Sequence, residues 1–236
     1  MPESDSAFLR AQWKHLAMLN YEVSPSLLSP LIPSGTELDS WNGKQYLSVV
    51  GFLFLNTRIY GIPVPFHRNF EEVNLRFYLR RKSDEGWRKG VAFIKELVPN
   101  PATAFLARFL YNENYAALGM NHDITAESIR YSWNHSGVEG HLALSGLSNP
   151  KPLEVGSREE FISEHYWGYS RQKDGTTMEY KVEHPRWMVR NAVSASLECD
   201  VANLYGKKFV DALNKKPEFS FVAVGSEVTI YKGKRI

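Results

Sequence analysis

Residues 71–80 read EEVNLRFYLR, a stretch in which polar and apolar side chains alternate. Successive side chains of a β-strand point to opposite faces, so this alternation separates the two kinds of side chain. The apolar face carries Val73, Leu75, Phe77 and Leu79. The polar face carries Glu72, Asn74, Arg76, Tyr78 and Arg80. The stretch therefore predicts an amphipathic strand whose apolar face packs on the protein core.

Two interpretations of the polar face are open. Side chains two residues apart lie about 7 Å from each other on one face of a strand, so Glu72, Asn74 and Arg76 suit one wall of a pocket. A glutamate accepts hydrogen bonds, an asparagine donates and accepts, and an arginine presents a donor fork that matches carboxylates or phosphates. In the other interpretation the polar face simply meets water. Alternation by itself does not decide between them.

The sequence on both sides of this strand is rich in strand and hairpin patterns. Asn42-Gly43 and Asp174-Gly175 are dipeptides typical of tight hairpin turns, and Ser83 to Gly86 joins two apolar-alternating runs. The predicted strands cover residues 11–23, 45–60, 70–82, 88–98, 125–134, 138–146, 165–171, 176–183, 188–198 and 219–232.

Helix patterns are fewer and short. Ser24-Pro25 and the pair Ser157 and Glu160 are typical helix starts, the second with the spacing of a capping box. Two more helices are expected over 101–111 and near 206–214. Many strands with hairpin turns and few helices favour an α+β, β-rich fold built on a curved antiparallel sheet or barrel. We find no linker, and expect one domain over residues 1–236.

Composition excludes several classes of protein. The 28 basic and 26 acidic residues leave a formal charge of +2, which gives no electrostatic reason to expect nucleic acid or an anionic membrane as a partner. No apolar run has the length of a membrane span, and Glu3 and Asp5 do not suit a secretory signal. The single cysteine, Cys199, lies in an apolar-alternating run and is expected to be a buried structural thiol. These features predict a cytoplasmic protein and leave its oligomeric state open.

No cofactor or metal motif is present in the sequence. The seven histidines include no pair at the helical spacing typical of zinc ligands, although His67 and His184 can still meet in space. There is no G-x-S-x-G nucleophile motif and no glycine loop of the phosphate-binding kind. We therefore expect no metal and no cofactor.

The pattern E-x-N-x-R-x-Y over 72–78, with the preceding loop GIPVPF over 61–66, resembles the YqjF-like family of uncharacterised proteins. The tyrosine-rich segment HYWGYSRQKDGTTMEYKVEHPRW over 165–187 resembles a hairpin of that family, and the run from Val224 to Tyr231 resembles its terminal strand. The chain departs from the family at His165, where arginine is more common. An anion-binding role for that position is therefore in doubt.

The resemblance implies the acetoacetate decarboxylase-like fold, with a partly enclosed cavity lined by Glu72, Asn74, Arg76 and Tyr78. The decarboxylase acts through a lysine activated by an adjacent cation. The matching positions here are Ala102 and Thr103, which cannot form a Schiff base, and Lys95 lies beside Glu96. Schiff-base decarboxylation is therefore not expected.

Three functions follow from these patterns. The first is binding of a small, anionic organic metabolite, such as a carboxylate, in an internal cavity, with Arg76 as its anchor. The second is a lyase or hydrolase with Glu72 as general base. The third is a non-catalytic scaffold whose interior is filled with side chains. Trp167 and Trp187 are candidates for the apolar wall of the cavity.

Overall fold

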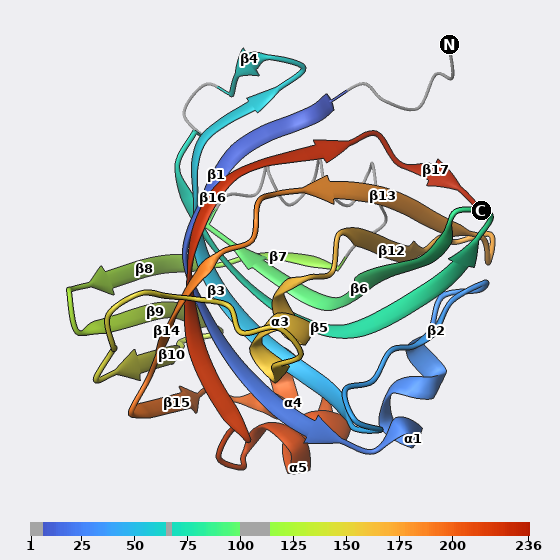
Figure 1. Cartoon of the computed structure of the whole chain (residues 1–236). Helices are drawn as coiled ribbons and strands as arrows, with labels where there is room; N and C mark the ends of the chain where they lie inside the picture. Colours follow the sequence, from blue (N-terminus) through green and yellow to red (C-terminus); the bar gives the residue numbers. More distant parts are fainter. Residues whose placement is uncertain (1–6, 65–67, 100–113) are drawn as a thin grey trace.

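The computed structural model describes residues 7–64, 68–99 and 114–236. Within these ranges the chain is built mainly from strands of two sheets, with a few short helices (Figure 1). The expected α+β, β-rich fold with a large curved sheet is confirmed. The helix predicted over 101–111, together with Ala102 and Thr103, lies outside the described residues, and so does His67.

Over the described residues the larger sheet has 13 strands, of which the longest are β1, β3, β5, β6 and β16. Along its main path the hydrogen-bonded order is β11-β14-β16-β1-β3-β5-β6-β12-β13-β17, while β2, β4 and β7 pair with β5, β3 and β6. Its strands are β1 (Ala7–Val23), β2 (Glu37–Leu38), β3 (Gln45–Ile59), β4 (Ile62–Pro63), β5 (Phe70–Ser83), β6 (Gly86–Val98), β7 (Tyr115–Ala117), β11 (Lys151–Pro152), β12 (Trp167–Arg171), β13 (Thr177–Glu183), β14 (Met188–Asn191), β16 (Phe219–Tyr231) and β17 (Lys234–Arg235).

The larger sheet curves back on itself. Val182 and Glu183 of β13 pair with Ile230 and Thr229 of β16, so hydrogen bonds run around the curve and return to β16 (Figure 1). Most neighbours are antiparallel, but β6 pairs in parallel with both β7 and β12. This curvature brings β5, β12 and β16, which are far apart in sequence, around one interior.

Irregular backbone in the long strands supports the curvature. The pairing of β1 with β3 shifts register between Lys14 and Ala17, and His15 within this bulge has a φ of 57°. Opposite the bulge, Gly225 has a φ of 81°, and a Cβ on it would lie 2.0 Å from the carbonyl oxygen of Trp13. Only glycine fits this close approach between β1 and β16.

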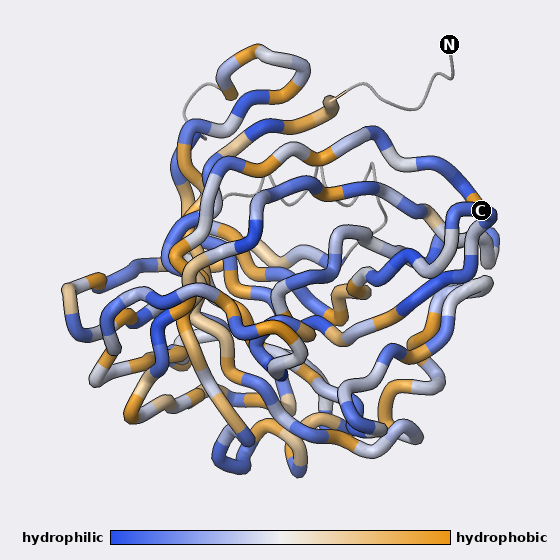
Figure 2. Tube along the Cα trace, in the orientation of Figure 1, coloured by the Kyte–Doolittle hydropathy of each residue, from blue (hydrophilic) through white to orange (hydrophobic). Residues whose placement is uncertain are grey.

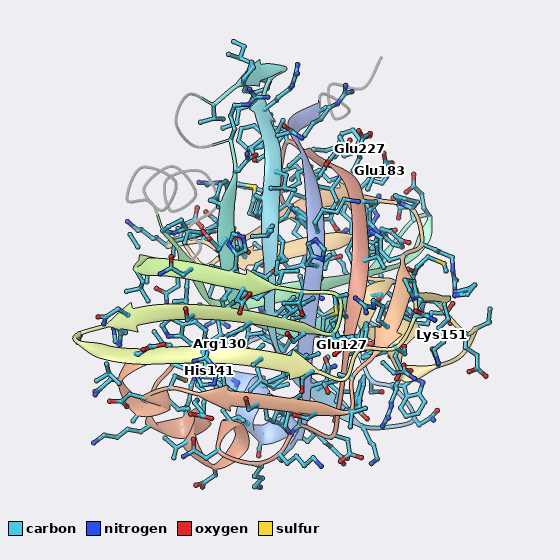
Figure 3. All side chains as sticks on the ribbon, turned by 90° about the vertical axis from the view of Figure 1, so that its left-hand side faces the viewer. Glu127, Arg130, His141, Lys151, Glu183 and Glu227 are labelled. Carbon is cyan, nitrogen blue, oxygen red and sulfur yellow. The ribbon has the colours of Figure 1, made fainter. Side chains whose placement is uncertain are left out.

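The smaller sheet packs on the outside of the larger one. Its strands have the order β15-β10-β9-β8, and Figure 3 shows them crossing in front of the long strands. A Cβ on Gly51 of β3 would lie 2.7 Å from the ring of Tyr131 and 2.9 Å from Leu142, so the two sheets are in close contact there. The strands are β8 (Gly119–Ile124), β9 (Ser128–His135), β10 (Val138–Ser145) and β15 (Ser194–Glu198).

The described helices are short and begin where cap residues predict. The side chain of Ser24 accepts a hydrogen bond from the Ser26 amide, and that of Ser157 accepts one from the Glu160 amide. Both expected helix starts are confirmed. The helices are α1 (Pro25–Leu28), α3 (Arg158–Ser163), α4 (Val201–Leu204) and α5 (Val210–Leu213), with 3-10 turns η1 (Ser29–Leu31) and η2 (Lys207–Phe209). None of the described helices has the length and apolar character needed to cross a bilayer.

One predicted strand, 188–198, was wrong. The structure divides it into β14, which pairs with β16 in the larger sheet, and β15, which pairs with β10 in the smaller sheet. Between them the chain leaves one sheet and joins the other, and Val193 is 85% exposed at the crossing. Apolar alternation continues through this crossing, so the pattern gave no indication of it. The short strand β8 was also not predicted.

Two apolar cores lie on opposite faces of β5. Val73, Leu75, Phe77 and Leu79 pack in the core between the two sheets, whereas Tyr78 packs in a second core inside the curve of the larger sheet. Figure 2 shows apolar and hydrophilic segments alternating along the strands. A strand placed between two cores must bury both faces, so the polar face of β5 is not turned to bulk water.

Candidate functional site

The predicted site strand lies where the sequence placed it, with its polar face enclosed. Glu72 is 4% exposed, Asn74 and Tyr78 are each 1% exposed, and Arg76 is half-buried. Their apolar neighbours on β5 fill the core against the smaller sheet. Polar side chains buried in this way need partners, because an unsatisfied buried polar group is costly.

Glu72, Asn74 and Arg76 line a cavity of about 70 Å³ inside the curve of the larger sheet. That volume is less than half of the ~150 Å³ that holds a benzene ring in a protein core. Much of the wall is aromatic, with Trp13, Phe52, Phe54, Phe93, Trp167 and Trp187. The expectation that Trp167 and Trp187 form part of the wall is confirmed.

Tyr78 occupies a different place from the other three. Its ring lies 4.9 Å from the ring of His165, and its hydroxyl donates to Ser48 Oγ at 2.7 Å. Ser48 in turn donates to Asn20 Oδ1 at 2.6 Å. Tyr78 therefore packs against the ring of His165 while its hydroxyl is held by Ser48 and Asn20, and it is not among the residues that line the cavity.

Glu72 is held by an amide. Asn74 Nδ2 donates to Glu72 Oε1 at 3.0 Å, and no described cation lies within 4.0 Å of the carboxylate. Burial raises the pKa of Glu72 to about 7, against the opposing effects of the Asn74 hydrogen bond and the charge of Arg76. Glu72 therefore changes its protonation state near neutral pH.

A bulge in β6 decides which residue of that strand faces the cavity. Leu75 pairs with Lys95 but Arg76 pairs with Phe93, so one extra residue is inserted in β6. As a result both Phe93 and Glu96 line the cavity, and Lys95 does not. Strict alternation from Phe93 would have turned Lys95 inward. Glu96 is 1% exposed.

His165 forms a buried pair with Asp39. His165 Nε2 lies 3.2 Å from Asp39 Oδ2, and the two side chains are 1% and 5% exposed. Burial lowers the pKa of His165, which keeps the ring neutral near pH 7. Burial alone would raise the pKa of Asp39, but the hydrogen bond and charge of His165, with Lys89 and the Ser40 amide, lower it below its usual value.

Residues that line the cavity carry several buried polar side-chain atoms that have no hydrogen-bond partner among the described residues. They are Trp13 Nε1, Asn74 Oδ1, Arg76 Nε, Ser163 Oγ and His165 Nδ1. Buried polar atoms in native proteins are nearly always paired, so a cluster of exceptions around one cavity needs an explanation. A bound polar molecule supplies one.

His184 contributes an apolar contact more than a charge. Its ring stacks on Trp187 with centroids 3.8 Å apart, and burial lowers its pKa to about 4. The ring is therefore neutral near pH 7. His184 lines the cavity together with Trp187.

Two other kinds of site find no support in the described part of the chain. It contains no group of three or more metal-ligating His, Cys, Asp or Glu side chains. Ser163, His165 and Asp39 resemble a triad in composition, but Ser163 Oγ and His165 Nδ1 do not hydrogen bond to each other. Cys199 is not among the residues that line this cavity. It is half-buried, where the sequence predicted a buried thiol, and burial raises its pKa to about 12.

Sequence reasoning identified the β5 residues but missed Asp39 and Trp13. Asp39 lies just after the two-residue strand β2, and Trp13 lies on β1, both far in sequence from residues 72–76. Neither carries a motif. His165 was considered only as a departure from a family pattern.

Comparison with known proteins places the fold and the family. "Uncharacterized protein YqjF" of Bacillus subtilis (strain 168) is 28% identical over 188 residues, which cover 78% of this chain and 76% of YqjF. The crystal structure of acetoacetate decarboxylase from Legionella pneumophila subsp. pneumophila str. Philadelphia 1 matches with a TM-score of 0.69 at 13% identity, over 100% of this chain and 90% of that chain.

The enduracididine biosynthesis enzyme MppR complexed with pyruvate matches with a TM-score of 0.65 at 8% identity, over 98% of this chain and 91% of that chain. At these identities the solved structures show the fold alone, which is acetoacetate decarboxylase-like. The model of the family described as "Uncharacterized conserved protein (COG2071)" matches residues 10–227. The chain therefore belongs to the DUF2071 family.

Proposed function

We propose that the cavity binds a small organic acid, with Arg76 as the anchor of its carboxylate. The observation that carries this proposal is the state of Arg76, which has no ion pair with any described residue. Its Nε has no hydrogen-bond partner in the described part of the chain, and one Nη donates to the Ile162 carbonyl oxygen at the long distance of 3.5 Å. A guanidinium in an aromatic cavity is a strong donor fork for a carboxylate.

The size and surroundings of the cavity restrict the acid. A volume of about 70 Å³ suits a molecule of a few non-hydrogen atoms. A protein of the same fold, MppR, has been seen complexed with pyruvate, which is such an acid. The existence of the cavity also counts against a scaffold with a filled interior.

The proposal does not include a Schiff base. The described residues of the cavity wall include no lysine, and Ala102 and Thr103 have no amine. Incubation with acetoacetate and borohydride should therefore leave the mass of the protein unchanged. A covalent adduct on any lysine would contradict this part of the proposal.

The main test is a calorimetric titration with acids of two to four carbons. We expect Arg76→Ala to weaken binding about 100-fold or more, because it removes the charged partner of a buried carboxylate. Arg80→Ala is a matched control on the same strand and face, since Arg80 is partly exposed and already paired with Glu37 at 2.7 Å. Equal affinities of Arg76→Ala and the parent protein would rule out Arg76 as the anchor.

Proton transfer by Glu72 is a second candidate function. The observation in its favour is the pKa of Glu72, raised to about 7 by burial, which suits a general base or acid at neutral pH. Exchange of the α-hydrogen of a bound acid with solvent deuterium, followed by NMR, should then occur with the parent protein and stop in Glu72→Gln. Exchange that continues in Glu72→Gln would exclude this role.

A further inference from the structure

His165 presents a hydrogen-bond acceptor beside the cavity. Its partner Asp39 is ionised and can only accept, so Nε2 of His165 must carry the hydrogen of their 3.2 Å hydrogen bond. In a neutral ring the other nitrogen, Nδ1, then has a lone pair and no hydrogen. Nδ1 has no partner among the described residues.

The pair is fixed in this orientation. The His165 ring lies between the rings of Tyr78 and Phe161, each with its centroid 4.9 Å away. The Ser40 amide donates to Asp39 Oδ1 at 2.9 Å, which leaves Oδ2 for His165. Lys89 Nζ lies 4.0 Å from Asp39 Oδ2 and favours the ionised carboxylate. The tautomer of His165 is thus determined by its surroundings.

Asn74 supplies a second acceptor. Its Nδ2 donates to Glu72, so its amide orientation is set, and none of the described residues donates to its Oδ1. The residues that line the cavity therefore carry acceptors at Asn74 and His165, as well as donors at Arg76 and Trp13, that have no partner among the described residues. A keto acid such as pyruvate carries only acceptors and can satisfy only the donors. A hydroxy acid of the same size satisfies both kinds of group.

We infer that the ligand of this cavity is a short hydroxy acid, whose carboxylate binds Arg76 and whose hydroxyl donates to Nδ1 of His165. This inference rests on the proposed function, because it assumes that Arg76 holds the carboxylate. It adds the second recognition element and the chemical class of the ligand. An acceptor left unsatisfied in a buried site disfavours a ligand that lacks the matching donor.

The test is calorimetry with lactate and pyruvate, which have the same carbon skeleton and differ at the hydroxyl. We expect the protein to bind lactate about 10-fold more tightly than pyruvate or better. Asp39→Asn is the decisive variant. Because the Ser40 amide retains the oxygen of the new side chain, its NH₂ group faces His165 Nε2 and moves the ring hydrogen to Nδ1. The lactate-to-pyruvate preference should then fall about 10-fold or reverse.

A structural readout accompanies the titrations. ¹⁵N NMR of the parent protein at pH 7 should show Nε2 of His165 protonated and Nδ1 unprotonated, and the reverse in Asp39→Asn. His165→Phe retains a ring between Tyr78 and Phe161 and should lose the preference. His141→Phe, at a histidine of the smaller sheet that is 9% exposed and outside the cavity wall, is the matched control and should keep it.

The outcomes separate the two proposals. Equal affinity for lactate and pyruvate, with both still dependent on Arg76, would overturn the hydroxy-acid inference and leave the proposed function in place. A protonated Nδ1 in the parent protein would also overturn the inference. Failure of every acid in the panel to bind would overturn the proposed function and the inference with it.

Discussion

The carboxylates of Glu179 and Glu72 are both buried, and they differ in what surrounds them. Glu179 on β13 is held by Arg81 at 3.2 Å and by Arg88 at 2.8 Å, with Lys234 Nζ at 3.9 Å. In the described structure Glu72 on β5 is held only by the Asn74 amide at 3.0 Å, and the guanidinium of Arg76 on the same strand has no carboxylate within 4.0 Å there.

The contrast teaches how this protein distributes its buried charges. At the Glu179 end of the sheet each charge has an opposite charge, so the burial of a carboxylate is compensated within the fold. Around the cavity the opposite charges of Glu72 and Arg76 are kept apart, and several polar atoms lack a partner within residues 7–64, 68–99 and 114–236. Groups left in this state reduce the stability of the free protein and are available to a ligand.

The largest expected change in the free energy of unfolding is that caused by substitution of Glu179. Glu179→Ala leaves two arginines without their shared carboxylate, and we expect it to lower the free energy of unfolding by about 3–5 kcal/mol in urea titrations. Glu183→Ala is the matched control on the same strand, since Glu183 is exposed and pairs with Lys181 (Figure 3). If Glu179→Ala lowers the free energy of unfolding as little as Glu183→Ala does, the arginines do not compensate the buried charge of Glu179, and the contrast with the cavity is wrong.

The second prediction concerns pH. Because the pKa of Glu72 is raised from 4.5 to about 7 in the folded state, the folded protein binds more protons than the unfolded chain between these values. Its stability should therefore fall by about 3 kcal/mol as pH rises from 4.5 through 7. Urea titrations of the parent protein and Glu72→Gln across this range check it. The difference between them should grow with pH, and a constant difference would contradict the prediction.

A smaller loss of stability is expected when Arg88, which pairs with Glu179, or Arg76, which lines the cavity, is replaced by alanine. Arg88 is paired with Glu179 and Glu85, and Arg88→Ala should cost about 2 kcal/mol. Arg76 has no ion pair with any described residue, so Arg76→Ala should cost less than about 1 kcal/mol. Thermal unfolding of the two variants side by side gives the comparison. A larger loss for Arg76→Ala would mean that Arg76 is a structural residue.

The smallest change in stability is expected for the exposed ion pair of Arg130 and Glu139, which serves as a reference for surface charges. Arg130 on the smaller sheet lies 3.6 Å from Glu139, and the two side chains are 43% and 71% exposed (Figure 3). Arg130→Ala should change the stability by no more than about 0.5 kcal/mol. A change comparable with that of Arg88→Ala would show that exposure does not separate the two classes of ion pair.

Much of the fold could be predicted from local patterns. The hairpin of β5 and β6, the hairpin of β12 and β13 and the start of α3 at Ser157 all follow from alternation, turn dipeptides and cap residues. The change of sheet between β14 and β15 could not be predicted, because the apolar alternation is the same whichever sheet receives the side chains.

The candidate site was predictable only in part. Glu72, Asn74 and Arg76 share one strand, so their common face follows from a period of two. Asp39, Trp13 and His165 come from other strands and loops, and no local pattern connects them. The bulge that turns Glu96 inward depends on the pairing of β6 with β5, which alternation along β6 does not reveal.

The sequence by itself determined that β5 has a polar face and an apolar face, because side-chain direction in a strand is fixed by the backbone. Only the tertiary structure decided that the polar face is enclosed. That enclosure needs the curved sheet to return from β13 to β16, and it needs the smaller sheet to cover the opposite face. Both are contacts between residues far apart along the chain, which no local pattern encodes.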